Sequence, residues 1–125
     1  MKIEVAKSDL EVALKVVSTT VGSGSDLSAH YLFRIHEDQT EVLSSYMRVF
    51  SRSSFTSNTD GEDGDAFTVE AWRLDKWISS VGDGVLTLAS DENGEVIAKG
   101  PRSRIKLRSL DSSRFPFWDG LLSNA

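Results

Sequence analysis

The feature that most constrains this chain is an internal repeat, in which apolar positions recur at an offset of 64 residues. The positions that match are Ile3, Val5, Leu10, Ala13, Leu14 and Val17 with Phe67, Val69, Leu74, Trp77, Ile78 and Val81. In each copy two alternating apolar positions come first and a helical stripe follows, so each copy predicts a strand and then a helix. A supersecondary unit that occurs twice is expected to bury its apolar face against its own duplicate.

The repeat continues beyond the helices, although changes of loop length alter its offset. Thr40-Glu41-Val42 matches Gly94-Glu95-Val96, and we match Tyr46-Met47-Arg48-Val49 with Arg104-Ile105-Lys106-Leu107. Each half is therefore predicted to be a βαβββ unit, with the two units packed face to face in one α+β domain over residues 1–125.

The segments rich in β-forming residues define these units. They are residues 31–35, 41–43 and 46–54 in the first repeat (about 1–58), and residues 85–89, 95–99 and 103–110 in the second (about 66–115).

Local signals predict where the elements begin and end. Ser8 and Glu11 have the spacing of a capping box, and the apolar stripe of that helix extends to Val21. Asn93-Gly94 predicts a hairpin. The polar segment 57–65 contains two glycines and is expected to be an exposed connection.

Composition narrows the possible functions. The absence of cysteine among the 125 residues excludes disulfides, cysteine nucleophiles and thiolate metal sites. No apolar run is long enough to cross a membrane, and the first residues alternate like a strand, so we expect a cytoplasmic protein without a signal peptide. The net charge of −5 argues against a protein that coats DNA through overall basicity. Basic residues nevertheless concentrate at Lys99, Arg102, Arg104, Lys106 and Arg108.

Catalytic and metal-binding patterns do not emerge from the remaining residues. The acidic cluster Asp60, Glu62, Asp63 and Asp65 lacks the spacing of a calcium-binding loop. The segment 22–25 lacks the Gly-Lys-Ser/Thr ending of a phosphate-binding loop, and His30 and His36 have no catalytic partners nearby in sequence. We therefore expect a protein that is not an enzyme and that holds no cofactor or metal.

Three segments resemble one known family in their order and spacing. They are the opening Met-Lys-Ile-Glu-Val with its helix, the segment Phe67-Thr68-Val69-Glu70-Ala71-Trp72-Arg73, and the segment from Gly100-Pro101-Arg102-Ser103-Arg104 to Leu110 followed by Phe115-Pro116. The third is similar to the signature Gly-Arg-Ser-Arg-Phe-x-Leu-x-x-Leu…Phe-Pro of the bacterial DNA polymerase III β subunit, the sliding clamp. The resemblance covers nearly the whole chain but only one of the family's three domains.

The resemblance implies a sliding-clamp domain of two βαβββ repeats, with both helices on one face of the sheets. Six such domains form the family's ring around DNA, with the helices lining the hole. A ring would then need about six copies of this chain, a homohexamer by extrapolation, unless the chain is a piece of a longer clamp or pairs with another protein. A virus is a plausible source. The implied function is a processivity factor that encircles double-stranded DNA without reading its sequence. Its implied partners are a DNA polymerase and a clamp loader.

The resemblance also places candidate DNA-facing residues on the helices, namely Lys7, Lys15, Arg73 and Lys76. Scattered cations suit a clamp, which neutralises phosphates loosely and reads no bases. The alternative is an ordinary solvated face, on which Glu11 and Lys15 form an ion pair one helical turn apart. A loop arginine of the family is replaced here by Gly24.

The candidate subunit interface pairs two edge strands from neighbouring copies, head to tail. One edge comprises Arg104, Ile105, Lys106, Leu107 and Arg108, and the other includes Tyr46, Arg48 and Phe50. Ile105 and Leu107 are expected to tolerate charged replacements without unfolding. The alternatives for the basic strand are an edge protected from aggregation by its charges, and a nucleic-acid surface.

Two other expectations concern aromatic residues. Trp72 and Trp77 are expected in or near the core, and the segment Phe115-Pro116-Phe117-Trp118 with Leu121 and Leu122 is expected to pack back on the domain, or else to border a groove for partner peptides.

Two rival functions remain open at this point. The first is an interaction module that keeps the fold without the ring, such as a decoy that binds a host clamp or polymerase. The second is a small α+β enzyme, which would require a catalytic cluster that the sequence does not offer.

Overall fold

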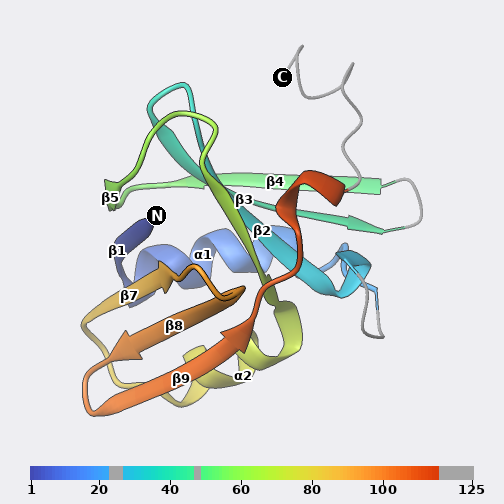
Figure 1. Ribbon diagram of the computed structural model, residues 1–125. Helices are drawn as coiled ribbons and strands as arrows, with labels where there is room; N and C mark the ends of the chain where they lie inside the picture. The colour runs from blue at the N-terminus through green and yellow to red at the C-terminus, as the bar shows by residue number, and fades with distance from the viewer. Residues whose placement is uncertain (23–26, 47–48, 116–125) are drawn as a thin grey trace.

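The computed structural model describes residues 1–22, 27–46 and 49–115, and its elements follow one another twice in the same order (Figure 1). The first unit contains β1 (Lys2–Ala6), α1 (Lys7–Val17), the 3-10 helix η1 (Leu27–Ala29), β2 (His30–His36), β3 (Gln39–Tyr46), β4 (Val49–Phe55) and β5 (Asn58–Asp60). The second unit contains β6 (Ala66–Glu70), α2 (Ala71–Ser80), β7 (Val85–Ser90), β8 (Glu95–Gly100), β9 (Ser103–Arg108) and the 3-10 helix η2 (Ser112–Arg114).

The two repeats interlock by exchanging their first strands. β1 pairs antiparallel with β7 of the second unit, where Ile3 lies opposite Leu88. β6 pairs in the same way with β2 of the first unit, where Phe67 lies opposite Phe33. The resulting sheets have the orders β5-β1-β7-β8-β9 and β4-β3-β2-β6. The units therefore share both sheets, instead of packing face to face as two separate layers.

The strand pairings fix the register of the repeat. The offset of 64 holds for the first strand and helix, because β1 and α1 begin at Lys2 and Lys7 while β6 and α2 begin at Ala66 and Ala71. For the last two strands the offset is 54, since the hairpin that pairs Tyr46 with Val49 corresponds to the one that pairs Gly100 with Ser103. The match of residues 46–49 with residues 104–107 is therefore wrong, and residues 46–54 are not one strand.

One apolar core joins both sheets and both helices. The helical stripes contribute Leu10, Ala13, Leu14, Val17, Leu74, Trp77 and Ile78. The inner sheet faces contribute Ile3, Val5, Tyr31, Phe33, Val42, Phe67, Val69, Leu86, Leu88, Val96, Ala98 and Leu107. Both helices lie on one side of the sheets (Figure 1), and this confirms the predicted α+β fold of two βαβββ repeats.

The first helix differs from the prediction at both ends. It begins at Lys7, directly after β1, with Ala6 as N-cap and no side-chain capping bond, so Ser8 already lies in the first turn and the predicted capping box is absent. The helix ends at Val17, and Val21 packs on the core from outside it. A strand that runs directly into a helix leaves no linker in which a capping residue could sit.

The predicted connection at residues 57–65 contains the short strand β5. Its residues pair with β1, where Ile3 lies opposite Thr59. Its polar sequence Asn-Thr-Asp has no strand-forming pattern, so the pairing depends on the exposed edge of β1 and could not be predicted from local composition.

A second, smaller cluster lies on the outer face of the four-stranded sheet, where Phe115 is buried against Leu32 and Leu43. The end of the described chain therefore packs back on the domain, as expected. The expectations for Phe117, Trp118 and residues 121–122 fall outside the described residues.

We predict that Gly100→Ala destabilises the fold by about 1–3 kcal/mol, because this is the usual cost of an extra methyl group in a packed core. A Cβ at Gly100 would lie 2.6 Å from Val81 Cγ2 and 2.8 Å from Leu86 Cδ2. Gly82→Ala is the matched control, since nothing lies within 4 Å of its Cβ position. Urea unfolding of both variants tests this, and equal midpoints would contradict the packing described for Gly100.

Candidate DNA-facing surface and open sheet edges

The solvent side of the helical layer carries few free cations. Lys15 and Lys76 are exposed, and neither takes part in an ion pair within the described residues. Arg73 is half-exposed, and its Nη1 lies 3.6 Å from Glu70 Oε1. Three of the four predicted DNA-facing residues therefore reach this surface.

Lys7 is largely buried, because its side chain bonds the backbone just after α2. Its Nζ donates a 2.6 Å hydrogen bond to the Val81 carbonyl and lies 3.9 Å from Asp83, while only 13% of its side chain is exposed. The backbone N–H of Lys7 donates to the Gly84 carbonyl. The prediction that Lys7 faces DNA is corrected on this ground, since a buried, hydrogen-bonded ammonium is not free to contact phosphate.

Asp75 lies in the groove between the two helices, where its Oδ2 accepts a 2.7 Å hydrogen bond from the Tyr31 hydroxyl. Burial raises the pKa of Asp75 above its ordinary value, and the Tyr31 bond opposes that rise. Burial, and then the bond to Asp75, raise the pKa of Tyr31 far above its usual range. The bond holds the Asp75 carboxyl in place at the groove between the helices.

Apolar side chains are exposed on the helices as well. Val12 and Val16 on α1 are 66% and 48% exposed, and Trp72 on α2 is 60% exposed. The expectation that Trp72 lies in or near the core is therefore wrong. Trp77 is buried as expected, and its indole N–H donates to Ser103 Oγ at 2.8 Å.

The sheets have four edges, of which two are short or covered. β5 has only three residues. The edge of β6 is covered by the chain after β9, because the Thr68 N–H donates to Ser109 Oγ and the Leu110 N–H donates to Thr68 Oγ1. β4 and β9 are the remaining edges, with seven and six residues, and within the described residues no strand pairs with their outer sides. On β9 the Arg108 N–H donates to Glu70 Oε1. The two strands occupy equivalent positions in the two repeats.

The predicted interface residues of β9 divide between its two faces. Arg104, Lys106 and Arg108 project from the outer face and are exposed. Ile105 is half-buried, and Leu107 is 1% exposed within the core. The expectation that Leu107 tolerates a charge is therefore wrong, and only its backbone remains at the edge.

The residues predicted for the opposite edge lie around the β3–β4 hairpin. Tyr46 is exposed at the end of β3, and Phe50 is half-buried on β4. Arg48 lies outside the described residues. Arg52 on β4 shares the Glu41 carboxylate with Arg34, since Glu41 Oε2 lies 3.6 Å from Arg52 Nε and Glu41 Oε1 lies 2.9 Å from Arg34 Nε.

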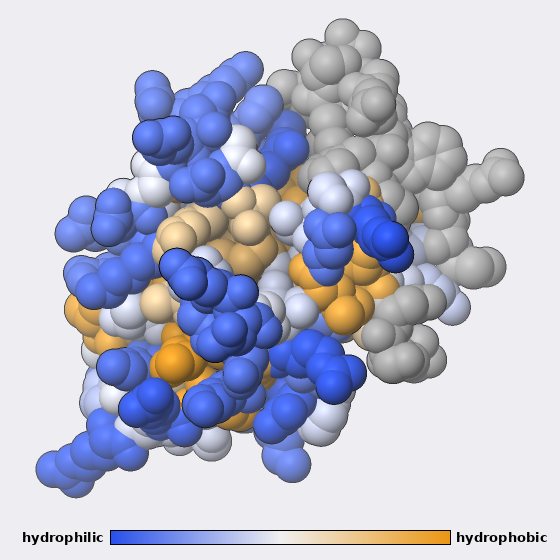
Figure 2. Space-filling view, in the orientation of Figure 1, coloured by the Kyte–Doolittle hydropathy of each residue, from blue (hydrophilic) through white to orange (hydrophobic). Residues whose placement is uncertain are grey.

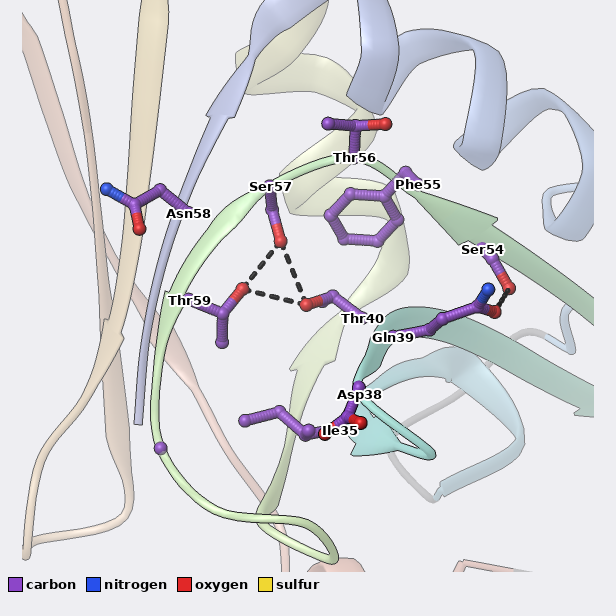
Figure 3. A pocket seen from close by; sticks show the side chains of 11 residues that line it. Ile35, Asp38, Gln39, Thr40, Ser54, Phe55, Thr56, Ser57, Asn58 and Thr59 are labelled. Atoms are coloured by element: carbon purple, nitrogen blue, oxygen red, sulfur yellow. Dashed lines mark hydrogen bonds between the residues drawn. The ribbon is translucent and has the colours of Figure 1, made fainter.

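A polar pocket of about 620 Å³ opens where the two sheets meet near β5 (Figure 3). Thr40 Oγ1 lies 2.7 Å from Thr59 Oγ1 and accepts from Ser57 Oγ at 2.8 Å, so these hydroxyls bond one another across the sheets. Within the described residues no histidine or carboxylate bonds to them, so the arrangement ties β3 to β5 and offers no activated nucleophile.

Among residues 1–22, 27–46 and 49–115, no group of three histidines or carboxylates is placed to hold a metal ion. In the same part of the chain, neither helix is long and apolar enough to span a membrane.

Solved structures of sliding clamps have the same architecture as this chain. The β clamp of Helicobacter pylori, solved with a DNA ligase peptide, superposes with a TM-score of 0.84 at 22% identity, over 94% of this chain and 33% of its own. The DNA polymerase III β subunit of Pseudomonas aeruginosa gives 0.83 at 21% identity, over 94% of this chain and 32% of its own. The chain has the sliding-clamp fold.

The β subunit of Caulobacter crescentus gives the same picture, with a TM-score of 0.83 at 20% identity over 94% of this chain and 32% of its own. This chain therefore spans about a third of the length of these sliding clamps. No protein-family model and no curated protein matches the sequence. The resemblance to sliding clamps is confirmed at the level of the fold.

The Tyr31–Asp75 pair generates a pH-dependent prediction. Because the pKa of Asp75 is raised in the folded protein, ionisation costs more there than in the unfolded chain, so its contribution to stability falls as pH rises from the ordinary carboxyl range through the raised value. Asp75→Asn removes this dependence while its amide oxygen still accepts from Tyr31. The free energy of unfolding of the Asn variant relative to the native protein should therefore rise between acidic and neutral pH.

Asp75→Ala is the contrasting variant, because it leaves the Tyr31 hydroxyl without its acceptor and should cost about 1–3 kcal/mol. Chemical unfolding across pH measures both variants. If the free energies of unfolding of the Asp75→Asn variant and the native protein differ by the same amount at every pH, the pKa of Asp75 is not raised by folding.

Proposed function

We propose that this chain is the repeating domain of a DNA sliding clamp, a processivity factor that encircles double-stranded DNA as a homo-oligomeric ring and has no catalytic activity of its own. The observation that carries the proposal is the pair of long edges, β4 and β9, which lie at equivalent positions of the two repeats and whose outer sides pair with no strand within the described residues. Open edges present unpaired backbone N–H and C=O groups. Pairing β9 of one copy with β4 of the next satisfies both edges, and closure of such head-to-tail contacts produces a ring.

The helices support the same contact. The groove between the helices is lined by Glu11, Lys15 and Asp75, so α2 lies on that flank of α1, and Val12 and Val16 face away from it. When β4 and β9 of neighbouring copies pair, α1 of one copy comes beside α2 of the next.

The surface that α1 of the neighbouring copy would contact is a groove of about 330 Å³ between α2 and β9. It is lined by Trp72, Arg73, Lys76, Trp77, Ser80 and Ile105. Val12 and Val16 supply an apolar surface for this groove, and the exposed carboxylate of Asp9 on the same flank suits Arg73 and Lys76.

The remaining helical surface suits loose contact with DNA. Without Lys7, which is bonded to the Val81 carbonyl, the helices carry three basic and three acidic residues, so this surface is close to neutral. Scattered cations on such a surface can contact the phosphate backbone without fixing the ring at one position, which sliding requires. No base-reading group is needed for this role.

The proposed partners follow from the function. A DNA polymerase would gain processivity from the ring, and a clamp loader or spontaneous opening would place the ring on DNA. The structure of the H. pylori clamp with a DNA ligase peptide supports binding of replication proteins as a second use of the ring.

Retention on circular DNA tests the proposal. The protein should remain on a closed circular plasmid through a high-salt wash, because a ring linked to a circle leaves only by opening, and it should be lost after the plasmid is cut once. Lys15→Glu should weaken loading, since it places an acid on the surface facing DNA and lies outside the proposed contact between copies. Equal loss from circular and linear DNA would contradict encirclement.

A further inference from the structure

A group of cations lies on the face of the five-stranded sheet that points away from the helices. Lys99 and Arg104 are opposite each other on β8 and β9, and Lys106 is opposite Ile97. Because inward Ala98, Ile105 and Leu107 alternate with them, these cations project from the outer face. Hydrophilic side chains cover much of this face over β8 and β9 (Figure 2).

The charges are not neutralised by the protein itself. None of Lys99, Arg104, Lys106 and Arg108 joins an ion pair within the described residues. The acids on the same face are Glu4, which pairs with Lys2 at 3.7 Å, Asp60, which lies opposite Lys2, and Glu95, which lies opposite Arg108. The end of the two strands that bears Lys99 and Arg104 therefore remains positive.

Two features of this end are unfavourable for the isolated fold. Like charges directly opposite each other on antiparallel strands repel, and Lys99 and Arg104 are such a pair. Arg102, in the turn that joins the strands, has φ of 61°, a left-handed conformation that favours glycine or asparagine. A bound anion would relieve the repulsion, and an arginine in the turn adds a further cation beside it.

The chemistry of the face selects among anionic partners. Around the cations lie Thr87, Ala89 and Ile97, with Val85 60% exposed at the start of β7. The outward positions of β7, β8 and β9 carry no aromatic side chain. A protein partner favours a large aromatic anchor, whereas phosphates need only cations. Successive outward residues of β9 are about 6.8 Å apart, and this suits an extended, repeating anion.

We propose that this outer face binds the sugar–phosphate backbone of nucleic acid, through Lys99, Arg104 and Lys106, with Arg102 at the end of the strands. The site lies on the opposite side of the sheet from the helices. It goes beyond encirclement and does not require ring closure. Without stacking side chains or base-reading groups, it binds independently of sequence and loses affinity as salt rises.

The test is fluorescence anisotropy of a labelled single strand and a labelled duplex, each of about 20 nucleotides or base pairs, between about 50 and 200 mM salt. The variant is Lys99→Gln with Arg104→Gln. The expected slope of log affinity against log salt is shallower by about 1.4 for the single strand and about 1.8 for the duplex, since each lost phosphate contact removes about 0.7 or 0.9. Tighter binding of the single strand or of the duplex shows which of the two nucleic acids the face prefers, and either result supports the site.

Arg114→Gln is the matched control, because Arg114 is an exposed arginine outside the sheet that pairs with Asp111 at 3.9 Å. It should leave the slope unchanged. Native mass and circular dichroism of all proteins are measured alongside. The proposal is overturned if the native protein binds neither probe, if the double variant binds like the native protein, or if the double variant changes the native mass, since the face would then serve self-assembly.

Discussion

The exchange of first strands between the repeats is the interaction on which the rest of the structure depends. Pairing of β1 with β7 and of β6 with β2 places a strand of each repeat inside the sheet of the other. Each helix follows its exchanged strand without a linker, so both helices are held on one side of the sheets. Neither repeat could bury its own apolar face alone, because Ile3 and Phe67 both pack in a sheet built mainly by the other repeat.

The same exchange determines which edges stay open. Because β6 ends beside the chain that leaves β9, hydrogen bonds through Thr68 cover that edge. Within the described residues no strand pairs with the outer side of β4 or β9, although the Arg108 N–H at the end of β9 donates to Glu70 Oε1. The repeat places these two strands at equivalent positions with different side chains. Arg52 on β4 shares the Glu41 carboxylate with Arg34, whereas the cations of β9 join no ion pair in the part of the chain that the structure describes. The two edges are equivalent in the repeat but differ in side chains. A head-to-tail contact joins two different surfaces of neighbouring copies, so such a pair of edges suits it.

The sequence predicted the fold where burial imposes a period. The stripes from Leu10 to Val17 and from Leu74 to Ile78, and the alternation around Ile3 and Phe67, were correct because core packing permits only those registers. Strand exchange and β5 depend on long-range pairing, which local patterns do not encode. The site was predicted less well. Lys7 is bonded to the Val81 carbonyl, which only three-dimensional neighbours determine. The alternation along residues 103–110 does place Leu107 inward, and the expectation that it tolerates a charge conflicts with that pattern.

Native mass measured by light scattering after size-exclusion chromatography, over a range of protein concentrations, tests the ring most directly. The account predicts about six times the chain mass of 13.8 kDa for the native protein and a loss of that assembly in Val16→Lys, which places a charge in the proposed contact. Val85→Lys is the control, because Val85 is 60% exposed on β7, a strand with neighbours on both sides. A native protein that stays monomeric at every concentration would contradict a self-sufficient clamp and favour the interaction module that keeps the fold without the ring.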